Sequence, residues 1–246
     1  MTSDIYKLFS PLLAQTLHFA QDAKDVPIEQ VGMELARLAE RAFAATGTTL
    51  HFNEHEEPFP LKLKEKCFFA ACAWADEVML TSDREDTHLW AVHSLQRHFF
   101  KTSDAGHLFF VYLAELLDEA GFRPANSADA SFEHRLEFGL GEAAASSLDS
   151  ANGQAILFYA QCILYGFCGE YFERDTVLVP LRKLAFDALT NAIPAASPSL
   201  HKEIPENKGK SSTVELAFYV ALPLVITFLF GMYNAGILAN IPMLSQ

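Results

Sequence analysis

Basic residues are scarce in this sequence. Its 246 residues include 18 Lys and Arg against 31 Asp and Glu, which leaves a net charge of −13 with His counted as neutral. Proteins that bind duplex nucleic acid neutralise phosphates with clustered Lys and Arg, so the shortage argues against a nucleic-acid partner. Disorder is also excluded, because half of the residues are apolar and a disordered chain has low hydrophobicity.

Charge is absent altogether after Glu215. The residues that follow are largely apolar as far as Leu238. A helix needs about 20 residues to cross the hydrocarbon core of a bilayer, and this segment is long enough. We therefore predict a transmembrane helix over 214–238 that contacts membrane lipid. The anchor prediction rests on Leu216, Phe218, Leu222, Pro223, Ile226, Phe230 and Tyr233. The alternative is a core helix of a soluble protein, although such helices usually keep a polar stripe and this segment has none.

The residues that flank this span predict its orientation. Lys202, Lys208 and Lys210 precede it, and no Lys or Arg follows it. The positive-inside rule then places the N-terminal part of the chain in the cytoplasm. Residues 239–246 are expected to form a short tail on the other side of the membrane.

Strand patterns are missing from the rest of the chain, since no stretch alternates apolar and polar residues over several positions. Helical periodicity is found instead, which predicts an all-α domain over residues 1–192. The expected helices cover residues 4–23, 27–45, 60–81, 87–101, 104–120, 152–172 and 175–192, with one short helix in a long connection over 122–150. Three prolines and little apolar content then predict a linker over 193–213.

The four cysteines do not form a recognisable motif. Cys67 and Cys72 are five positions apart, and Cys162 and Cys168 are six apart. Neither spacing is that of a zinc or redox site. We expect reduced thiols buried in apolar helices, as is usual in cytoplasmic proteins.

Enzyme motifs are missing as well. The sequence has neither a GxxxxGK[ST] phosphate loop nor a GxSxG nucleophile turn, and the glycines of residues 139–144 follow no apolar strand. His51 and His55 with Glu54 would share one face of a helix and bind a metal, but two nearby prolines favour a loop. We expect no catalytic residues, no metal and no cofactor; a tail-anchored metal-dependent enzyme is the alternative.

The most unusual local feature is the acidic pair Asp76-Glu77 inside the apolar run CFFAACAWADEVML. On a helical wheel, Asp76 falls at the edge of the apolar stripe and Glu77 opposite to it, facing solvent. One interpretation is that the pair only makes the helix soluble. The other is a docking point for a basic partner, formed by Asp76 and Glu77 with the nearby acids Asp83, Glu85 and Asp86.

Several segments resemble the DotU/IcmH/TssL family, the short membrane-anchored component of type VI and type IVB secretion systems. The similar segments are AACAWADEVMLT at 70–81, the segment 90–100 ending in HFF, SDAGHLFFVYLAELL at 103–117, and YAQCILYGFCGEYFERDTVLVPLRKL at 159–184. The last is the most specific, with an apolar helix, Gly-Phe-x-Gly-x-Tyr and a helix that carries Leu-Arg. The resemblance covers roughly residues 5–238.

This resemblance implies a function and a location. The domain over 1–192 would be a hook-like body of two helical bundles, and the chain would be a single-pass protein of the bacterial inner membrane with its C-terminal tail in the periplasm. It would be a non-enzymatic scaffold that links a TssM/IcmF-like inner-membrane partner to the cytoplasmic baseplate and dimerises through its anchor. Asp76 and Glu77 match an acidic pair linked to baseplate contacts in the family. The alternative is the IcmH/DotU component of a type IVB system.

The chain differs from the family pattern in two segments. The family commonly has Gly-Gly-Glu where this chain has Ala105-Gly106-His107, and often has Arg at the position of Glu170.

Overall fold

Helix α3, Leu63–Leu80, is the central element of the fold. The computed structural model describes residues 4–47, 60–125 and 130–192, which belong to the first of two units, Met1–Pro194 and Ala195–Gln246. These described residues form helices and connecting loops, without a strand. The other elements are α1 (Asp4–Gln21), α2 (Ile28–Ala44), η1 (Thr87–Leu89), α4 (Trp90–His93), α5 (Leu95–Phe100), α6 (Ala105–Glu119), α7 (Phe132–Ala144), α8 (Ala151–Leu164), η2 (Gly169–Tyr171) and α9 (Asp175–Ala192).

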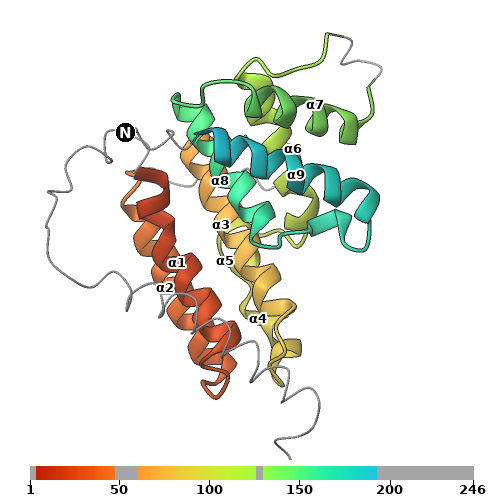
Figure 1. Cartoon of the computed structure of the whole chain (residues 1–246). Helices are drawn as coiled ribbons and strands as arrows, with labels where there is room; N and C mark the ends of the chain where they lie inside the picture. Colours follow the sequence, from red (N-terminus) through yellow and green to blue (C-terminus); the bar gives the residue numbers. More distant parts are fainter. Residues whose placement is uncertain (1–3, 48–59, 126–129, 193–246) are drawn as a thin grey trace, which may run out of the picture. The chain divides into compact units, whose positions relative to one another are not determined.

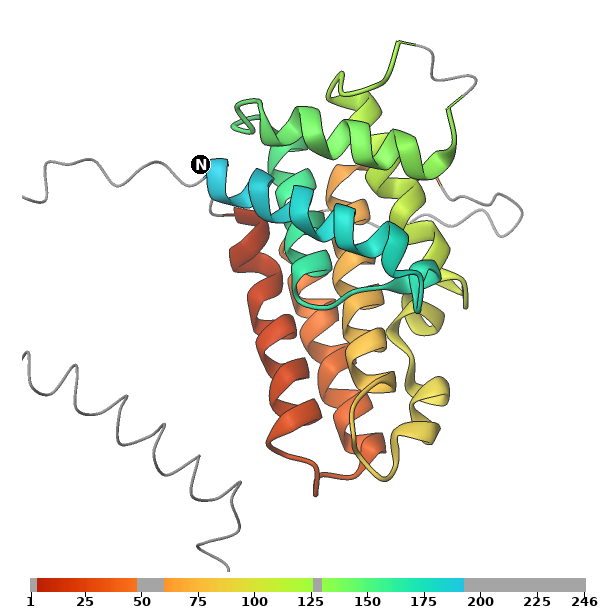
Figure 2. The same cartoon turned by 45° about the vertical axis from the view of Figure 1, so that its right-hand side comes forward.

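The helices pack in two directions. Helices α1, α2 and α3 run alongside one another, while α9 passes across α8 and lies next to α7 (Figures 1 and 2). Helix α3 contacts α6 and α8 as well as α1 and α2. The buried apolar side chains accordingly form one continuous core in the described residues, so these two sets of helices are not independent packing units.

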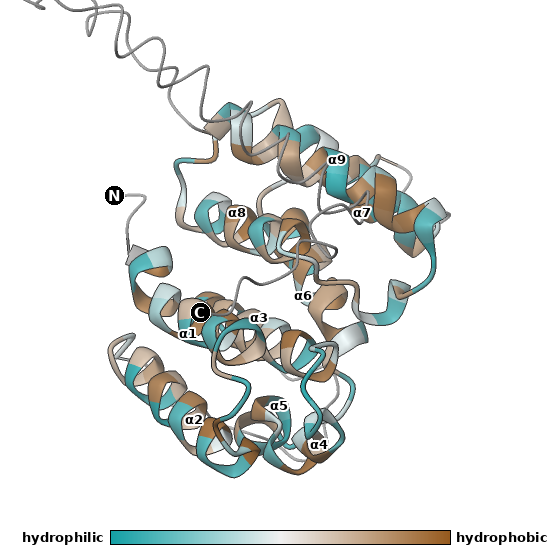
Figure 3. Ribbon diagram, turned by 60° about the horizontal axis from the view of Figure 1, so that its bottom comes forward, coloured by the Kyte–Doolittle hydropathy of each residue, from teal (hydrophilic) through white to brown (hydrophobic). Residues whose placement is uncertain are grey.

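The sequence explains the different environments of the helices. Helix α2 carries apolar residues at helical spacing and is buried on one side only, so hydrophilic and hydrophobic positions alternate along it in Figure 3. In α3, by contrast, every residue from Glu65 to Asp76 is buried. Trp74, Phe68 and Phe69 are all fully inaccessible. A helix that is apolar on nearly all sides is stable only when other helices surround it, and this places α3 in the middle.

The expected all-α fold is confirmed for the described residues, and several helix positions are close to those predicted. Helices α1, α2 and α3 lie within the predicted ranges 4–23, 27–45 and 60–81, and α9 has the predicted bounds. The short helix expected within 122–150 is α7. It begins after Ser131, whose side chain accepts a hydrogen bond from the His134 backbone N–H.

Two predicted helices are shorter than expected. The helix over 87–101 is interrupted at Ser94, whose ψ of 128° ends α4 before α5 begins. The helix over 152–172 ends at Leu164. There Gly166 has φ +100°, its N–H donates to the Ile163 carbonyl at 3.2 Å, and the next N–H donates to Cys162 at 3.0 Å. This is a Schellman motif, which glycine forms readily because it has no Cβ to clash at positive φ.

The predicted membrane anchor lies outside the described residues, as do the linker over 193–213 and the tail over 239–246. This includes all of the anchor residues from Leu216 to Tyr233. No helix of residues 4–47, 60–125 and 130–192 has the length and apolar character needed to cross a bilayer.

The cysteines are free thiols. Cys67, Cys72 and Cys162 are buried as expected, whereas Cys168 is half-buried. Burial raises the pKa of the Cys67 thiol to about 12, so this thiol stays protonated near neutral pH.

Candidate functional site: the acidic pair of α3

The carboxylate of Asp76 lies inside the protein. The residue is 1% exposed, and its Oδ1 accepts hydrogen bonds from Trp90 Nε1 at 3.0 Å and from the Leu95 backbone N–H at 2.8 Å. Its Oδ2 accepts from Ser94 Oγ and from the Gln96 backbone N–H, both at 2.8 Å. Both oxygens are therefore fully used within the protein.

This geometry makes Asp76 the cap of α5. The first backbone N–H groups of a helix have no partner within the helix and carry partial positive charge, so an acceptor is needed there. Ser94 precedes α5 but accepts no hydrogen bond from it, because the Leu95 and Gln96 N–H groups donate to Asp76, and the Ser94 hydroxyl also donates to Asp76. The Asp76 side chain of α3 therefore fixes the position of the break between α4 and α5 at Ser94.

Burial and hydrogen bonding act on the pKa of Asp76 in opposite directions. Loss of water around the carboxylate raises the pKa from 3.8 to about 6, and this is the larger effect. The four hydrogen bonds from Gln96, Leu95, Ser94 and Trp90 favour the charged form and limit the rise. Asp76 is consequently charged near neutral pH and becomes protonated in mild acid.

Glu77 holds a second backbone turn. Its Oε1 accepts from the Cys168 N–H at 2.7 Å and its Oε2 from the Gly169 N–H at 2.8 Å, at the start of η2. Burial raises the pKa of Glu77, while the backbone N–H groups and Arg182 oppose that rise. The expectation that Glu77 faces solvent is therefore wrong.

The helical wheel misplaced both acids because it assumes one buried face. Asp76 was expected at the edge of the apolar stripe and is instead inside the core, since η1, α4 and α5 cover that side of α3. The side opposite to the stripe, where Glu77 lies, is covered by the loop between α8 and η2. A direct contact of the Asp76 carboxylate with a partner is not compatible with this arrangement.

Glycine is required where η2 approaches α6. Gly169 has φ +51°, and a Cβ at this residue would lie 2.5 Å from the Gly106 carbonyl oxygen. A Cβ at Gly106 would lie 3.2 Å from the Gly169 backbone. Beside this contact, His107 Nδ1 lies 3.0 Å from Glu170 Oε2. The two segments in which the chain departs from the family pattern therefore meet in space and form a charge pair with each other when His107 is protonated.

The remaining docking candidates lie in the loop after α3. Asp83 is exposed and its carboxylate is 2.6 Å from Lys24 Nζ. Glu85 is exposed, and Asp86 is half-buried. Asp86 accepts two hydrogen bonds from Arg84, both at 2.9 Å, so part of the negative charge of this run is neutralised inside the protein.

Arg84 and Lys66 are buried cations that the sequence did not identify. Besides Asp86, Arg84 donates to the carbonyls of Phe19, Ala23 and Val26, where α1 ends and the chain turns toward α2. Lys66 Nζ lies 2.9 Å from Glu115 and 2.8 Å from Glu119 of α6. Lys66 could have been identified from its place inside an apolar run. A lysine there is expected to be buried, and a buried ammonium needs a carboxylate partner. No local pattern marks Arg84 as buried, because its carbonyl acceptors come from a distant part of the chain.

The alternative metal site is not described, because His51, Glu54 and His55 lie in the segment 48–59. In the parts of the chain that are described, no cluster of His, Cys, Asp or Glu has the geometry of a metal site.

The described part is thus an all-helical domain in which two adjacent carboxylates of a buried helix each hold a backbone turn. Residues 4–125 match the family model of the type VI secretion system protein DotU. The chain belongs to the DotU family. The match includes Asp76 and Glu77 and stops before the segment 159–184. No curated protein and no solved structure matches the chain significantly.

Proposed function

We propose that this DotU-family protein is a non-enzymatic, tail-anchored scaffold of a type VI secretion membrane complex. It links a TssM/IcmF-like inner-membrane protein to the cytoplasmic baseplate. The observation that carries the proposal is the family match over residues 4–125, which includes the α3–α5 segment with its acidic pair. Structural proteins of this kind work through surfaces that bind partners, and their activity is measured as complex formation.

The proposed baseplate surface is the loop after α3. Exposed Asp83 and Glu85 lie between two partly exposed leucines, Leu80 and Leu89. Acidic side chains beside exposed apolar residues suit a basic partner, since charge guides the encounter and apolar contact slows dissociation. Asp76 supports this surface indirectly, because it accepts a hydrogen bond from Trp90, where the acidic loop ends.

Co-purification from membranes tests this proposal. Asp83→Lys combined with Glu85→Lys is expected to reduce the recovery of baseplate proteins by about tenfold or more, because both charges that attract the partner are reversed. The matched control is Glu142→Lys with Asp149→Lys, which reverses two exposed acids of another region and is expected to leave recovery unchanged. Equal recovery with both double variants would contradict the docking surface.

The proposed location is the bacterial inner membrane, with the N-terminal domain in the cytoplasm, one span over 214–238 and a periplasmic tail. The support is the uncharged, apolar sequence after Glu215 and the lysines before it. A chain truncated after residue 213 is expected to leave the membrane fraction and to lose dimerisation through the anchor. Retention of the truncated chain in alkali-washed membranes would exclude this anchor.

A type IVB system is the second candidate, because the resemblance covers both kinds of secretion system. The scaffold role would be the same and the partners would differ. Contractile-sheath genes next to the coding gene are expected for a type VI system and not for a type IVB system.

A further inference from the structure

A groove lies between α2 and the α4–α5 break. Its volume is about 340 Å³. Beside the groove, α4 approaches α2 closely at Gly32, where a Cβ would lie 2.8 Å from the Cβ of His93. We call it the Val92 groove and define it by Met33, Ala36, Val92, His93, Arg97 and His98.

The rim of the Val92 groove is unusually apolar for an exposed surface. Val92 of α4 is 79% exposed and Met33 of α2 is 68% exposed. They are the two most exposed large apolar residues in the described part of the chain and both line the groove. Isolated exposed apolar residues are common, but two that line one concave site on neighbouring helices are typical of an interaction surface.

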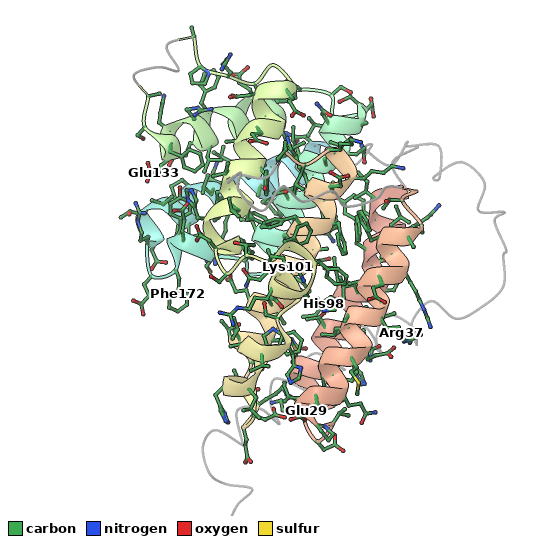
Figure 4. The ribbon with its side chains drawn as sticks, turned by 180° about the vertical axis from the view of Figure 1, so that it is seen from behind. Glu29, Arg37, His98, Lys101, Glu133 and Phe172 are labelled. Atoms are coloured by element: carbon green, nitrogen blue, oxygen red, sulfur yellow. The ribbon has the colours of Figure 1, made fainter. Side chains whose placement is uncertain are left out.

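The groove also contains basic side chains on an acidic protein. Arg97 is exposed and, among residues 4–47, 60–125 and 130–192, its guanidinium forms no ion pair; it donates only to the Ala91 carbonyl at 3.5 Å. His98 lies 3.7 Å from Glu40 of α2, and Figure 4 shows it between α5 and α2, with Lys101 just past the end of α5. In a chain of net charge −13, an unpaired arginine with two histidines beside it favours an acidic ligand.

The shape and charge together indicate a protein segment as the occupant. Anionic membrane surfaces are bound by clusters of about four to eight Lys or Arg, whereas the lining residues of this groove include a single arginine. An amphipathic helix places apolar side chains at i, i+3 and i+4 on one face, with polar residues alongside them. One or two carboxylates on such a helix would suffice to pair with Arg97 and with protonated His98.

We propose that the Val92 groove binds a short acidic, amphipathic segment of a partner protein, with an aliphatic side chain between Met33 and Val92 and a carboxylate on Arg97. The wall of the groove at Ser94 is held by the hydrogen bond of its hydroxyl to Asp76. This wall is therefore in place before binding, which reduces the entropy lost on binding. The lining of the groove includes no residue of the acidic loop, so this proposal does not rest on the docking surface of the proposed function.

Fluorescence polarisation with the full-length chain tests the binding chemistry. The probe is a fluorescein-labelled helical peptide of about 18 residues, or five turns, with Leu along one face and Glu beside it. A second peptide has Lys in place of every Glu. We expect the Glu peptide to bind at least about tenfold more tightly than the Lys peptide, and less tightly at high salt. Equal affinity for the two peptides, or no binding of the Glu peptide, would overturn the proposal.

Matched double variants assign the binding to this groove. Val92→Asp combined with Arg97→Glu is expected to weaken the binding of the Glu peptide by about tenfold or more. The control, Val179→Asp with Lys183→Glu, makes the same kind of change on the exposed side of α9, where Val179 is 59% exposed, and is expected to leave binding unchanged. Met33→Asp, on α2, gives an independent second variant that should also weaken binding. Unchanged affinity in the groove variants would refute the assignment.

Photo-crosslinking in cells identifies the natural occupant. A photoreactive amino acid at position 92, compared with one at position 179, is expected to crosslink an acidic, apolar segment of another protein only from position 92. Arg97→Glu should reduce that crosslink. Crosslinks from position 92 to lipid, to a second copy of this chain or to a basic segment, or no excess over position 179, would each contradict the proposal.

Discussion

The indole N–H of Trp90 donates a hydrogen bond to the buried carboxylate of Asp76 at 3.0 Å, and the two residues are 14 positions apart in the chain. This bond connects the core helix α3 to the short helical segments that follow it. The α4–α5 break, the end of the acidic loop and one wall of the Val92 groove are all positioned by this carboxylate. Asp76 therefore influences two proposed binding surfaces without being exposed on either.

Asp76→Ala is expected to destabilise the domain by about 4 kcal/mol. The substitution leaves four donors without an acceptor in a buried site, including the Trp90 indole and the Ser94 hydroxyl, and each unsatisfied donor costs about 1–3 kcal/mol before relaxation. Urea unfolding measures the loss. The control Asp149→Ala removes an exposed acid and should change stability by less than about 0.5 kcal/mol. A similar, small effect of both substitutions would show that Asp76 does not cap α5.

The cost of Asp76→Asn is expected to depend on pH. Because burial raises the pKa of Asp76 from 3.8 to about 6, the folded state holds more protons than the unfolded state between about pH 4 and 6. The contribution of this group to the free energy of unfolding is therefore greatest below about pH 4 and falls as pH rises through that window. The pKa difference corresponds to about 3 kcal/mol.

Unfolding of the wild type and of Asp76→Asn at about pH 4 and pH 7 measures this effect. The asparagine variant has lost the titrating group, so its cost should be larger at the lower pH. Other carboxylates with lowered pKa, such as Glu34 and Asp83, have the opposite pH dependence, but they occur in both proteins and cancel in the comparison. The same cost at both pH values would contradict the raised pKa.

Arg84→Met is expected to cost about 3–5 kcal/mol. The substitution removes donors from the carbonyls of Phe19, Ala23 and Val26 and leaves the partly buried Asp86 without its partner. Thermal unfolding measures the change. Arg84→Lys should rescue only part of the loss, because an ammonium cannot reproduce the planar pattern of donors.

Arg37→Met is the control for Arg84, because Arg37 is exposed on α2 and pairs with Glu34 three residues away. Exposed pairs of this kind contribute at most about 1 kcal/mol. If Arg37→Met were as destabilising as Arg84→Met, the buried network around Arg84 would not account for the loss.

Gly169→Ala is expected to destabilise the domain by about 2 kcal/mol or more. The residue has φ +51°, and the added Cβ would lie 2.5 Å from the Gly106 carbonyl oxygen, so backbone must move. Gly121→Ala is the matched control, since Gly121 has φ +86° and open space around the added Cβ. Denaturant unfolding of both variants should show the larger loss of unfolding free energy for Gly169→Ala. Equal losses would mean that the positive φ alone causes the effect and that the close contact with Gly106 does not contribute.

Long periodic segments were predicted well, for a simple reason. Helices α1, α2 and α9 carry apolar residues at helical spacing over 17 or 18 residues, and this pattern is local. The break at Ser94 was missed because a distant group competes there with local helix formation. Ser94 lies within a good helical pattern, but the Asp76 carboxylate takes the Leu95 and Gln96 N–H groups and starts a new helix there.

The site was predicted only in part. Asp76 and Glu77 stand out because two acids lie in an apolar run, and the structure gives both of them specific partners. Their orientation was wrong, because a helical wheel contains no information about what covers the other sides of α3. The basic, apolar Val92 groove was not predicted at all, since Met33 of α2 and Val92 of α4 are far apart in the sequence.

The sequence by itself determined the all-α class, most helix positions, the acidic character of the chain and the family resemblance, because composition, periodicity and motifs are properties of neighbouring residues. Only the tertiary structure decided that Asp76 and Glu77 are structural acceptors. Their donors come from residues 14–20 and 91–92 positions away, and only folding brings those donors together with the carboxylates. A buried carboxylate without hydrogen-bond donors is strongly unfavourable. The folded state is therefore stable only when these distant donors reach Asp76 and Glu77.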